Sequence, residues 1–425
     1  MRKLKLVILL IIIFSLSACK EDLPIIEDDT QLDVRYVEVG EQLDLHIDLL
    51  ENKYDFDAIH YNIQYDSITS DLFVYNQRNE VFAAKPGVTP FSIYLYKNEE
   101  LVVVANYGIF IVYELYDEDD DSWTALNSLN FYDEITSNPA GKFYLAEDID
   151  ASLELQSRSI ELFTGSLLNP YHYKIINYNR LGSTVNGLFQ EINHAYIDGL
   201  IIEDANATGN NMANSSSFGF LANAAYSSYI TNLRVTGVIL GVRGDHIGGL
   251  VGESSGCYYR SISFEGSIQG NAYYIGGLFG KILDYNDESL LDSITIENAY
   301  VIADLESTRE SNHVQAFIGQ VSYFQGVESS IEIYNGYFDG EILPNTLPTV
   351  YYFCYASFNN SEDITYRNLY TTQIENLTES RLYGDWNLIN YIDYETLISG
   401  EELEGLSGFT FALGEYPVLK GWLQP

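Results

Sequence analysis

The sequence predicts an all-β protein in which an N-terminal β-sandwich is followed by a right-handed parallel β-helix, a solenoid of stacked coils. Three observations lead to this fold class. Tyr and Gly account for 36 and 32 of the 425 residues, and Met occurs twice, a balance that favours strands and tight turns over helices. Residues 34–114 alternate apolar and polar side chains in short segments. From residue 123 onward, a two-part motif recurs with a nearly constant step.

The charge of the chain argues against one class of partner. The sequence has 61 acidic and 21 basic side chains, which gives a formal net charge of −40. A protein this acidic has no general positive field with which to hold nucleic acid or anionic lipid headgroups. Hydrophobic residues make up 46% of the chain, which is enough for packed cores, so global disorder is not expected.

Residues 1–18 have the layout of a secretory signal peptide. Three cations precede a short apolar run: Arg2, Lys3 and Lys5, then Leu6 to Phe14. The run is too short to span a bilayer comfortably. The residues Leu16-Ser17-Ala18-Cys19 resemble the lipobox of bacterial lipoproteins. The resemblance implies that Cys19 is the mature N-terminus and carries a diacylglycerol thioether, which anchors the protein in the cell membrane on its extracellular face. An uncleaved anchor and ordinary secretion stay open as alternatives.

Residues 19–33 are predicted to form a polar tether, and residues 34–114 a β-sandwich. The predicted strands are Leu43 to Ile47, Ala58 to Ile63, Leu72 to Tyr75, Val81 to Ala84, Thr89 to Tyr96 and Leu101 to Val112. Turn residues such as Pro86-Gly87 separate them, which is typical of a sandwich. Three segments resemble those of bacterial Ig-like domains: Val37 to Glu41, Ser70-Asp71 and Val81 to Gly87. The resemblance implies an Ig-like fold for this part of the chain.

An acidic linker is predicted at residues 115–122. The block Asp117 to Asp121 is five consecutive carboxylates, which cannot enter a core. Calcium is an alternative interpretation, because oxygen ligands suit this cation. Counted from Asp117, however, the sixth loop position is Ser122 rather than Gly, and the twelfth is Ser128 rather than Glu. A solvated linker is therefore favoured.

Beyond Trp123, two blocks repeat in phase. The first, Gly-apolar-apolar, begins at Gly187, Gly219, Gly249 and Gly277, with a degenerate copy at Ala316, in steps of 32, 30, 28 and 39 residues. The second is apolar-x-x-apolar-x-apolar, with copies at Ile197/Leu200/Ile202, Ile230/Leu233/Val235, Tyr259/Ile262/Phe264 and Leu291/Ile294/Ile296. Such a repeat indicates a solenoid, because the inward residues of one period are buried only by the next.

The glycines of the first block are predicted to lie at coil corners, where the chain turns with no room for a Cβ. These corner positions are Gly187, Gly219, Gly248, Gly249, Gly276 and Gly277. Coils stack about 4.8 Å apart, so about six or seven of them make a body about 30 to 35 Å long. Parallel crossovers are expected to be right-handed.

Two corner segments, Ile247 to Gly252 and Ile275 to Gly280, are each followed by an Ile-bearing strand and resemble the GLUG motif of bacterial surface proteins. Gly141 to Asp150 and Phe163 to Leu167 resemble the segments that begin the β-helices of those proteins. The resemblance implies a GLUG-type β-helix over residues 123–425, closed by a C-terminal cap. It implies no activity, because the repeated residues are those that a coil needs for packing.

The sequence offers little for catalysis, so we name no catalytic residue and expect no metal or cofactor. His-Glu-x-x-His and Gly-x-Ser-x-Gly do not occur, and the six histidines are dispersed. Paired carboxylates, such as Asp148 with Asp150 or Asp339 with Glu341, are candidates for glycoside cleavage. In a chain with 61 acids, such pairs are more simply explained as solvated turns. Cys257 and Cys354 are predicted to be buried small residues rather than a disulfide.

Tyrosine pairs give a different candidate site. Neighbouring rings at Tyr258-Tyr259, Tyr273-Tyr274 and Tyr351-Tyr352 must point to opposite faces of a strand. Outward rings on stacked coils would form a platform for a sugar or a protein, and the candidate binding residues are Tyr258, Tyr273 and Tyr351. Tyrosine is also simply a good strand former, which stays open as the alternative.

The leading functional hypothesis is a non-enzymatic, lipid-anchored cell-surface protein that presents its β-helix for adhesion or for binding a surface glycan or protein. The second is a polysaccharide-acting hydrolase or lyase that uses a carboxylate pair, and the third is a passive envelope stalk. A cleft lined by converging carboxylates and aromatic residues would favour the enzyme, and a flat face would favour the other two.

Overall fold

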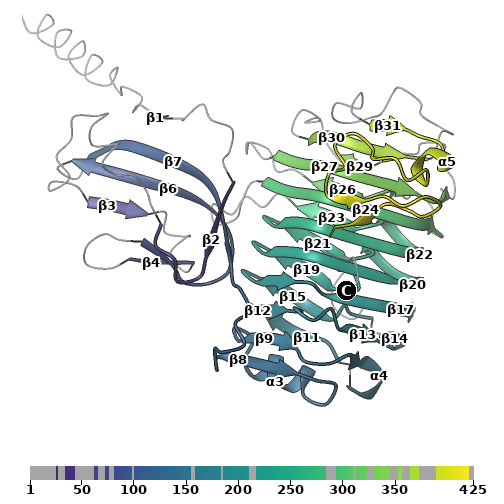
Figure 1. Cartoon of the computed structure of the whole chain (residues 1–425), viewed down its shortest axis with the longest axis horizontal. Coiled ribbons are helices and arrows are strands. Elements are labelled where there is room, and N and C mark those ends of the chain that lie inside the picture. Colours follow the sequence, from purple (N-terminus) through teal and green to yellow (C-terminus); the bar gives the residue numbers. More distant parts are fainter. Residues whose placement is uncertain are drawn as a thin grey trace, which may run out of the picture.

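The structure of the chain is a computed structural model, shown in Figure 1. It describes residues 25–26, 34–43, 62–65, 72–75, 81–97, 100–154, 158–182, 185–209, 217–283, 293–309, 313–322, 330–343, 353–356, 364–372 and 389–420. These residues are mostly in strands, arranged as a smaller N-terminal part beside a stack of coils. No helix within these ranges is long and apolar enough to cross a membrane.

The N-terminal module, which comprises the described residues between 25 and 114, contains two sheets. The five-stranded sheet consists of β1 (Ile25–Ile26), β2 (Val34–Glu38), β3 (Asn62–Tyr65), β6 (Gly87–Lys97) and β7 (Glu100–Tyr113). The two-stranded sheet pairs β4 (Phe73–Tyr75) with β5 (Val81–Ala83). The buried rings of Phe73, Phe91 and Phe110 pack edge to face, with centroids 5.2 to 5.8 Å apart. This small aromatic core joins the two sheets.

Residues from Trp123 onward form a parallel β-helix, because each strand of a coil pairs in parallel with its counterpart in the next coil. The 17-stranded sheet consists of β8 (Trp123–Leu126), β9 (Lys142–Leu145), β10 (Ile149–Asp150), β12 (Ser166–Leu168), β13 (Lys174–Ile176), β14 (Asn179–Gly182), β16 (Tyr196–Asp198), β17 (Ile201–Gly209), β18 (Ser217–Phe218), β20 (Tyr229–Gly248), β22 (Tyr258–Gly276), β24 (Ser293–Ser307), β25 (His313–Gln315), β27 (Ser330–Asp339), β28 (Ile342–Leu343), β30 (Ile364–Thr371) and β31 (Ile389–Tyr391). The seven-stranded sheet consists of β11 (Ile160–Phe163), β15 (Phe189–Asn193), β19 (Ala222–Tyr226), β21 (Val251–Ser255), β23 (Phe279–Leu283), β26 (Ile318–Ser322) and β29 (Cys354–Ala356).

The register of the coils confirms the predicted repeat for its first three copies and corrects the fourth, which begins at Ile296 rather than at Leu291, because Ile296 is the residue that pairs with Tyr259. Ile197 pairs with Ile230, which pairs with Tyr259, which pairs with Ile296. All four side chains are fully buried, as expected for inward residues of the second block. They belong to one continuous core that runs through the coil stack from Leu126 to Leu369. The period in the sequence therefore corresponds to one coil of the structure.

The six predicted corner glycines lie where other backbone segments come very close. A Cβ added at any of Gly187, Gly219, Gly248, Gly249, Gly276 or Gly277 would lie 2.1 to 2.4 Å from a backbone oxygen. None of the six has a positive φ. Close approach of the chain, rather than an unusual backbone conformation, therefore favours glycine at these positions.

The N-terminal end of the coil stack is covered by a helix, whereas the C-terminal segment, which the sequence predicted to close the other end, packs on the side of the coils. Helix α3 (Phe131–Ser137) buries Phe131 and Ile135 against the first coils, and a short helix, α4 (Ala151–Glu154), follows. In the C-terminal segment, α5 (Tyr394–Leu397) and the hairpin of β32 (Phe409–Thr410) and β33 (Val418–Leu419) pack on a column of outward tyrosines from successive coils, Tyr300, Tyr337 and Tyr370. This C-terminal cap, residues 389–420, folds back over one face of the coils (Figure 1).

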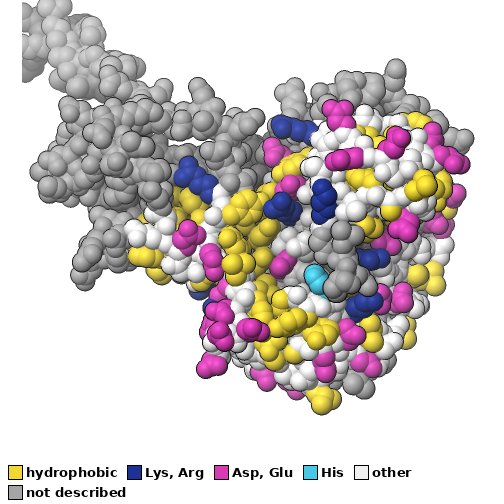
Figure 2. All heavy atoms as spheres, in the orientation of Figure 1, with side chains coloured by type: hydrophobic (Ala, Val, Ile, Leu, Met, Phe, Trp, Pro, Cys, Tyr) yellow, Lys and Arg dark blue, Asp and Glu magenta, His cyan; other side chains and the backbone are white. Residues whose placement is uncertain are grey.

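The N-terminal module lies against the coil stack and shares an apolar interface with it. Hydrophobic side chains gather along the border between the two parts in Figure 2. The ring of Tyr36 in β2 packs edge-on against Tyr229 and Tyr258, and the backbone N–H of Val88 donates to the carbonyl of Ser227. The buried Glu114 carboxylate accepts a hydrogen bond of 2.8 Å from Ser166 and pairs with Lys142. Residues 117–119, 121 and 122 of the acidic segment are exposed.

We expect a fragment of residues 122–425 to stay β-rich but to become less stable than the full chain. The core of the coils contains no residue of the N-terminal module, so it should persist in the fragment. Loss of the module would, however, expose the apolar interface that includes Tyr196, Tyr229 and Tyr258. Each of these rings has about 150 Å² or more to expose. Circular dichroism and binding of a hydrophobic dye would check this. A helical spectrum, or a fragment with unchanged melting temperature and no dye binding, would contradict it.

Candidate functional site

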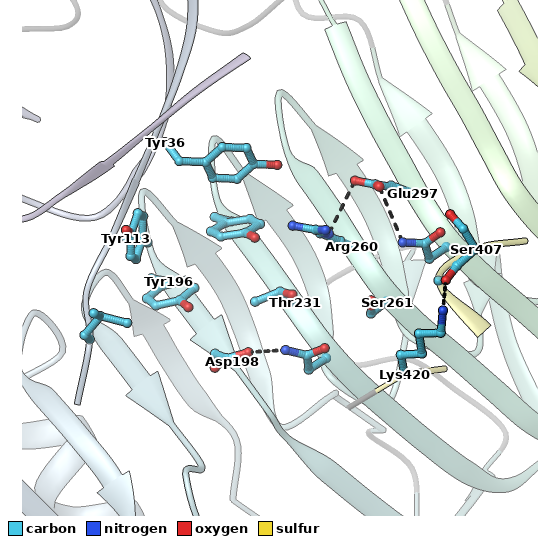
Figure 3. A pocket seen from close by; sticks show the side chains of 15 residues that line it. Tyr36, Tyr113, Tyr196, Asp198, Thr231, Arg260, Ser261, Glu297, Ser407 and Lys420 are labelled. Carbon is cyan, nitrogen blue, oxygen red and sulfur yellow. Dashed lines mark hydrogen bonds and ion pairs between the residues drawn. The ribbon is translucent and has the colours of Figure 1, made fainter. Parts of the chain in front are cut away.

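A pocket of about 580 Å³ lies where three parts of the chain meet (Figure 3). The N-terminal module and the residue that follows it contribute Tyr36, Tyr113 and Leu115, and the cap contributes Ser407, Gly408 and Lys420. The floor is the face of the coils and consists of Tyr196, Asp198, Tyr229, Thr231, Asn232, Arg260, Ser261, Glu297 and Asn298. In Figure 3 the tyrosines lie on one side of the pocket, and Ser407 and Lys420 lie on the other.

Phenol groups form one wall of the pocket. Tyr196 and Tyr229 occupy equivalent positions in neighbouring coils, and their rings stack 5.2 Å apart at an angle of 9°. Both rings are nearly buried, so their faces are used in packing and their edges border the pocket. Burial raises the pKa of Tyr196 and of Tyr229. Both hydroxyls are protonated at physiological pH, as an ordinary phenol is, and can donate hydrogen bonds as well as accept them.

Next to the phenols runs a column of polar side chains from four successive coils. Asp198 pairs in register with Thr231, Thr231 with Arg260, and Arg260 with Glu297. Glu297 lies 3.5 Å from Arg260 Nε and accepts a hydrogen bond of 3.0 Å from the hydroxyl of Tyr258. The Asp198 carboxylate accepts a 2.7 Å hydrogen bond from Asn232 Nδ2. Burial raises the pKa of Asp198, and this hydrogen bond opposes the rise.

The turn that follows this column has a left-handed backbone in coil after coil. The φ angles are 77° at Gly199, 49° at Asn232, 56° at Ser261, 55° at Asn298, 59° at Asn335 and 52° at Asn368. Glycine and asparagine adopt this conformation most readily. Three of these turns, at Asn232, Ser261 and Asn298, line the pocket. The same turn at Asn335 lies outside it and provides a matched control position.

The two carboxylates of the pocket are too far apart to act as a hydrolytic pair. Asp198 and Glu297 are separated by three coil steps, which at about 4.8 Å each amount to about 14 Å along the stack. Retaining glycosidases hold their carboxyls about 5 Å apart, and inverting ones at most about 9.5 Å. Glu297 is also bound by Arg260 and Tyr258. The column is thus better suited to hydrogen bonding than to bond cleavage.

Of the carboxylate pairs that the sequence suggested, Asp148, Asp150 and Asp339 accept hydrogen bonds within the protein, and Glu341 is exposed. Asp148 accepts from the backbone of Lys174, and Asp150 accepts from Ser152 and from Asn177, which lowers its pKa. Asp339 accepts from Thr372 and Tyr416. Neither pair lines the pocket. These contacts give the pairs a structural role, which is more specific than the solvated turns that the sequence suggested.

The predicted tyrosine platform differs from the structure at Tyr258. Its ring points outward from the coil as expected, but the N-terminal module covers it, so the side chain is only 4% exposed. Its hydroxyl contacts those of Tyr36 and Tyr334 and donates to Glu297. Tyr273 is 40% exposed, and Arg309 lies over its ring. Cys19 and Tyr351 lie outside the described residues.

A buried polar cluster around His246 lies in the coils outside the pocket. The ring contacts Ser217 Oγ through Nδ1 and Gln320 Oε1 through Nε2, both at 3.2 Å, and stacks on Tyr274. Burial lowers its pKa to about 4, and the nearby Lys281 cation adds to this. No group of three or more His, Cys, Asp or Glu in the described ranges is placed to hold a metal ion. Cys257 is buried and has a free thiol, and the side chain of Cys354 is not among those described.

Comparisons with known proteins give no family for this chain. No family model matches the chain, and no curated protein matches it. Among solved structures, an IgA1 protease is similar to 77% of this chain, with 18% sequence identity and a TM-score of 0.45. The match covers 25% of that protein, so this chain spans about a quarter of its length.

Proposed function

We propose that this protein is a lipid-anchored cell-surface protein that binds a carbohydrate in the pocket between its N-terminal module, its β-helix and its cap. The observation that carries the proposal is the lining of the pocket. It combines phenol and alcohol hydroxyls, two amides, two carboxylates and two cations around one cavity. Groups that both donate and accept hydrogen bonds match a polyhydroxylated ligand, and a concave site favours ligand binding over a passive stalk.

Binding is preferred to hydrolysis because of the spacing of the carboxylates. A glycoside hydrolase would need a second carboxyl within about 10 Å of Asp198. The column places Thr231 and Arg260 in the two coils between Asp198 and Glu297. Both are groups that hold a ligand by hydrogen bonds. An adhesive role, in which a surface glycan is held but not cut, is consistent with this arrangement.

We expect Asn232→Gly to weaken carbohydrate binding about tenfold. Glycine adopts the left-handed backbone of this turn, so the substitution removes the amide with little strain. Loss of one hydrogen-bonding group next to a carboxylate is worth about 1.5 kcal/mol, which is about a factor of ten in affinity. A glycan array of residues 20–425, followed by calorimetry on the best ligand, would measure this.

The matched control is Asn335→Gly, which makes the same change in the equivalent turn outside the pocket. It is expected to keep the affinity of the wild type. Equal losses of affinity in both variants would show that the effect is a general weakening of the coils. Absence of any glycan binding by the wild type would contradict the proposed function.

The lipid anchor is the other half of the proposal and rests on the residues before Cys19. We expect Cys19→Ser to move the protein from the membrane fraction to the medium or periplasm, because nine apolar residues are a poor membrane anchor. Labelling cells with a fatty-acid probe would check it. An unlabelled wild type, or a variant that stays in the membrane fraction, would contradict lipidation. The Ig-like identity of residues 34–114 and the GLUG identity of the coils belong to the same proposal.

A further inference from the structure

We propose that the ligand of this pocket is an uncharged oligosaccharide of about two or three sugar residues, which lies along the axis of the coil stack and contacts the floor from Asp198 to Asn298. This inference rests on the proposed function and specifies its ligand. Three properties of the floor support it: its length, its balance of charge, and an unsatisfied acceptor at its far end.

The length of the floor exceeds that of a single sugar. The lining residues come from four successive coils, which begin with Tyr196 and Asp198 and end with Glu297 and Asn298. Three steps between these coils span about 14 Å. A single pyranose ring covers about one coil step, so it would leave most of the floor without a partner. A short chain of sugars aligned with the stack reaches both ends.

The charge of the pocket disfavours an anionic sugar. Its lining contains two carboxylates, on Asp198 and Glu297, and two cations, on Arg260 and Lys420. Both cations already have partners, because Arg260 pairs with Glu297 and Lys420 donates to the carbonyl of Ser407. The whole chain has a net charge of −40 and repels anions. A uronic acid or a sulfated sugar would find no unshared cation in the lining, whereas neutral hydroxyls find donors and acceptors on every coil.

The far end of the floor has an acceptor with no partner. Asn298 is only 5% exposed, and its Oδ1 atom has no hydrogen-bond partner in the structure, although its Nδ2 atom donates to Glu297. A buried acceptor without a partner costs free energy, and ligand sites are one place where such groups persist. The amide lies against Gly408 of the cap, at the edge of the same pocket. Gly408 covers this atom in the unliganded protein, so a hydroxyl of the sugar farthest from Asp198 would satisfy it once the Asn298 amide turns toward the pocket.

Calorimetry on residues 20–425 tests the proposal with defined probes. The probes are cellotriose, maltotriose and chitotriose, the monosaccharides glucose and N-acetylglucosamine, and trigalacturonate. We expect at least one neutral trisaccharide to bind, its monosaccharide to bind at least tenfold more weakly, and trigalacturonate to give no measurable heat. Asn298→Gly keeps the backbone conformation and is expected to weaken the trisaccharide about fivefold, whereas Asn335→Gly leaves its affinity unchanged.

The outcomes separate this inference from the proposed function. If a monosaccharide binds as tightly as its trisaccharide, or if trigalacturonate binds as tightly as the neutral probes, the inference is wrong and carbohydrate binding stands. If a trisaccharide binds but Asn298→Gly and Asn232→Gly behave like Asn335→Gly, the sugar lies elsewhere on the protein, so both the inference and the assignment of carbohydrate binding to this pocket are wrong. If none of these probes binds and the glycan array is also empty, the proposed function itself is wrong.

Discussion

Replacing Gly249 with alanine is expected to lower the free energy of unfolding by about 3 kcal/mol, the upper end of what one inserted methyl group costs in a packed interior. The added Cβ would lie 2.3 Å from the carbonyl oxygen of Gly277 and 2.5 Å from the ring of Phe264. The first contact is with the backbone of the next coil, which cannot move without breaking the hydrogen bond from the Gly249 N–H to that same oxygen. Two neighbouring coils must therefore separate.

The matched control is Gly241→Asn, at a turn where an added Cβ meets nothing within 4 Å. Its φ of +68° is one that asparagine tolerates, so the expected cost is less than about 1 kcal/mol. Hydrogen exchange would measure both variants. Because coils contact only their neighbours, Gly249→Ala should remove protection from β21 and β23 and leave β6 and β7 of the N-terminal module protected. Equal loss in the two variants would mean that the corner is not closely packed.

The coils could be predicted because, in a solenoid, residues at equivalent positions of successive repeats contact each other. Residues that touch between coils, such as Ile230 and Tyr259, occupy equivalent positions in the repeat. Aligning the two sequence blocks therefore also aligns the strand pairs of the first three copies, whereas the fourth copy is predicted five residues too early. The corner glycines follow from the same logic, since Gly249 and Gly277 are adjacent in space as well as equivalent in sequence. Predicting the coils requires no contact between segments that are far apart in the sequence and unrelated by the repeat.

A recurrent asparagine in the repeat also indicates part of the site. With the fourth copy placed at Ile296, as the strand register requires, asparagine lies two residues after the first apolar residue in four copies. These begin at Ile230, Ile296, Ile333 and Tyr366, and the asparagines are Asn232, Asn298, Asn335 and Asn368. Asparagine recurring at one position of a repeat indicates a left-handed turn. Aligning this position would have placed Asn232 and Asn298 on one line, beside the outward column that forms the floor of the pocket. The sequence therefore contains enough information to predict the floor of the pocket, but not its walls.

The pocket itself could not be predicted, because it joins segments that share no repeat. Tyr36 and Lys420 both line it, although they lie near opposite ends of the sequence. Nothing in the period of the coils specifies which outward face the N-terminal module or the cap will cover. Tyr258 shows the same limit. Its ring points outward from the coil as predicted, but its exposure could not be predicted, because it depends on the N-terminal module, whose Tyr36 packs against it. Outward residues of a solenoid are defined locally, but what covers them is not.

Acid is expected to destabilise the fold by about 3 kcal/mol through His246 alone. The pKa of this imidazole falls from 6.5 to about 4 on folding, because burial and the Lys281 cation disfavour its charged form. The unfolded chain therefore binds a proton more readily than the folded one between these two values. Stability from this group is complete above pH 6.5 and is lost as the pH falls through about 4, at about 1.4 kcal/mol for each pH unit.

The variant His246→Gln should remove this part of the pH dependence. Glutamine does not titrate, and its amide can still contact Ser217 or Gln320, which hold the two ring nitrogens in the wild type. Urea unfolding at pH 7, 5.5 and 4 would measure the difference, and other acid-sensitive groups cancel when variant and wild type are compared. The control is His172→Asn, which replaces an exposed histidine in a left-handed turn that asparagine accepts. If His246→Gln and wild type lose the same free energy of unfolding from pH 7 to 4, His246 does not stay neutral in the folded state.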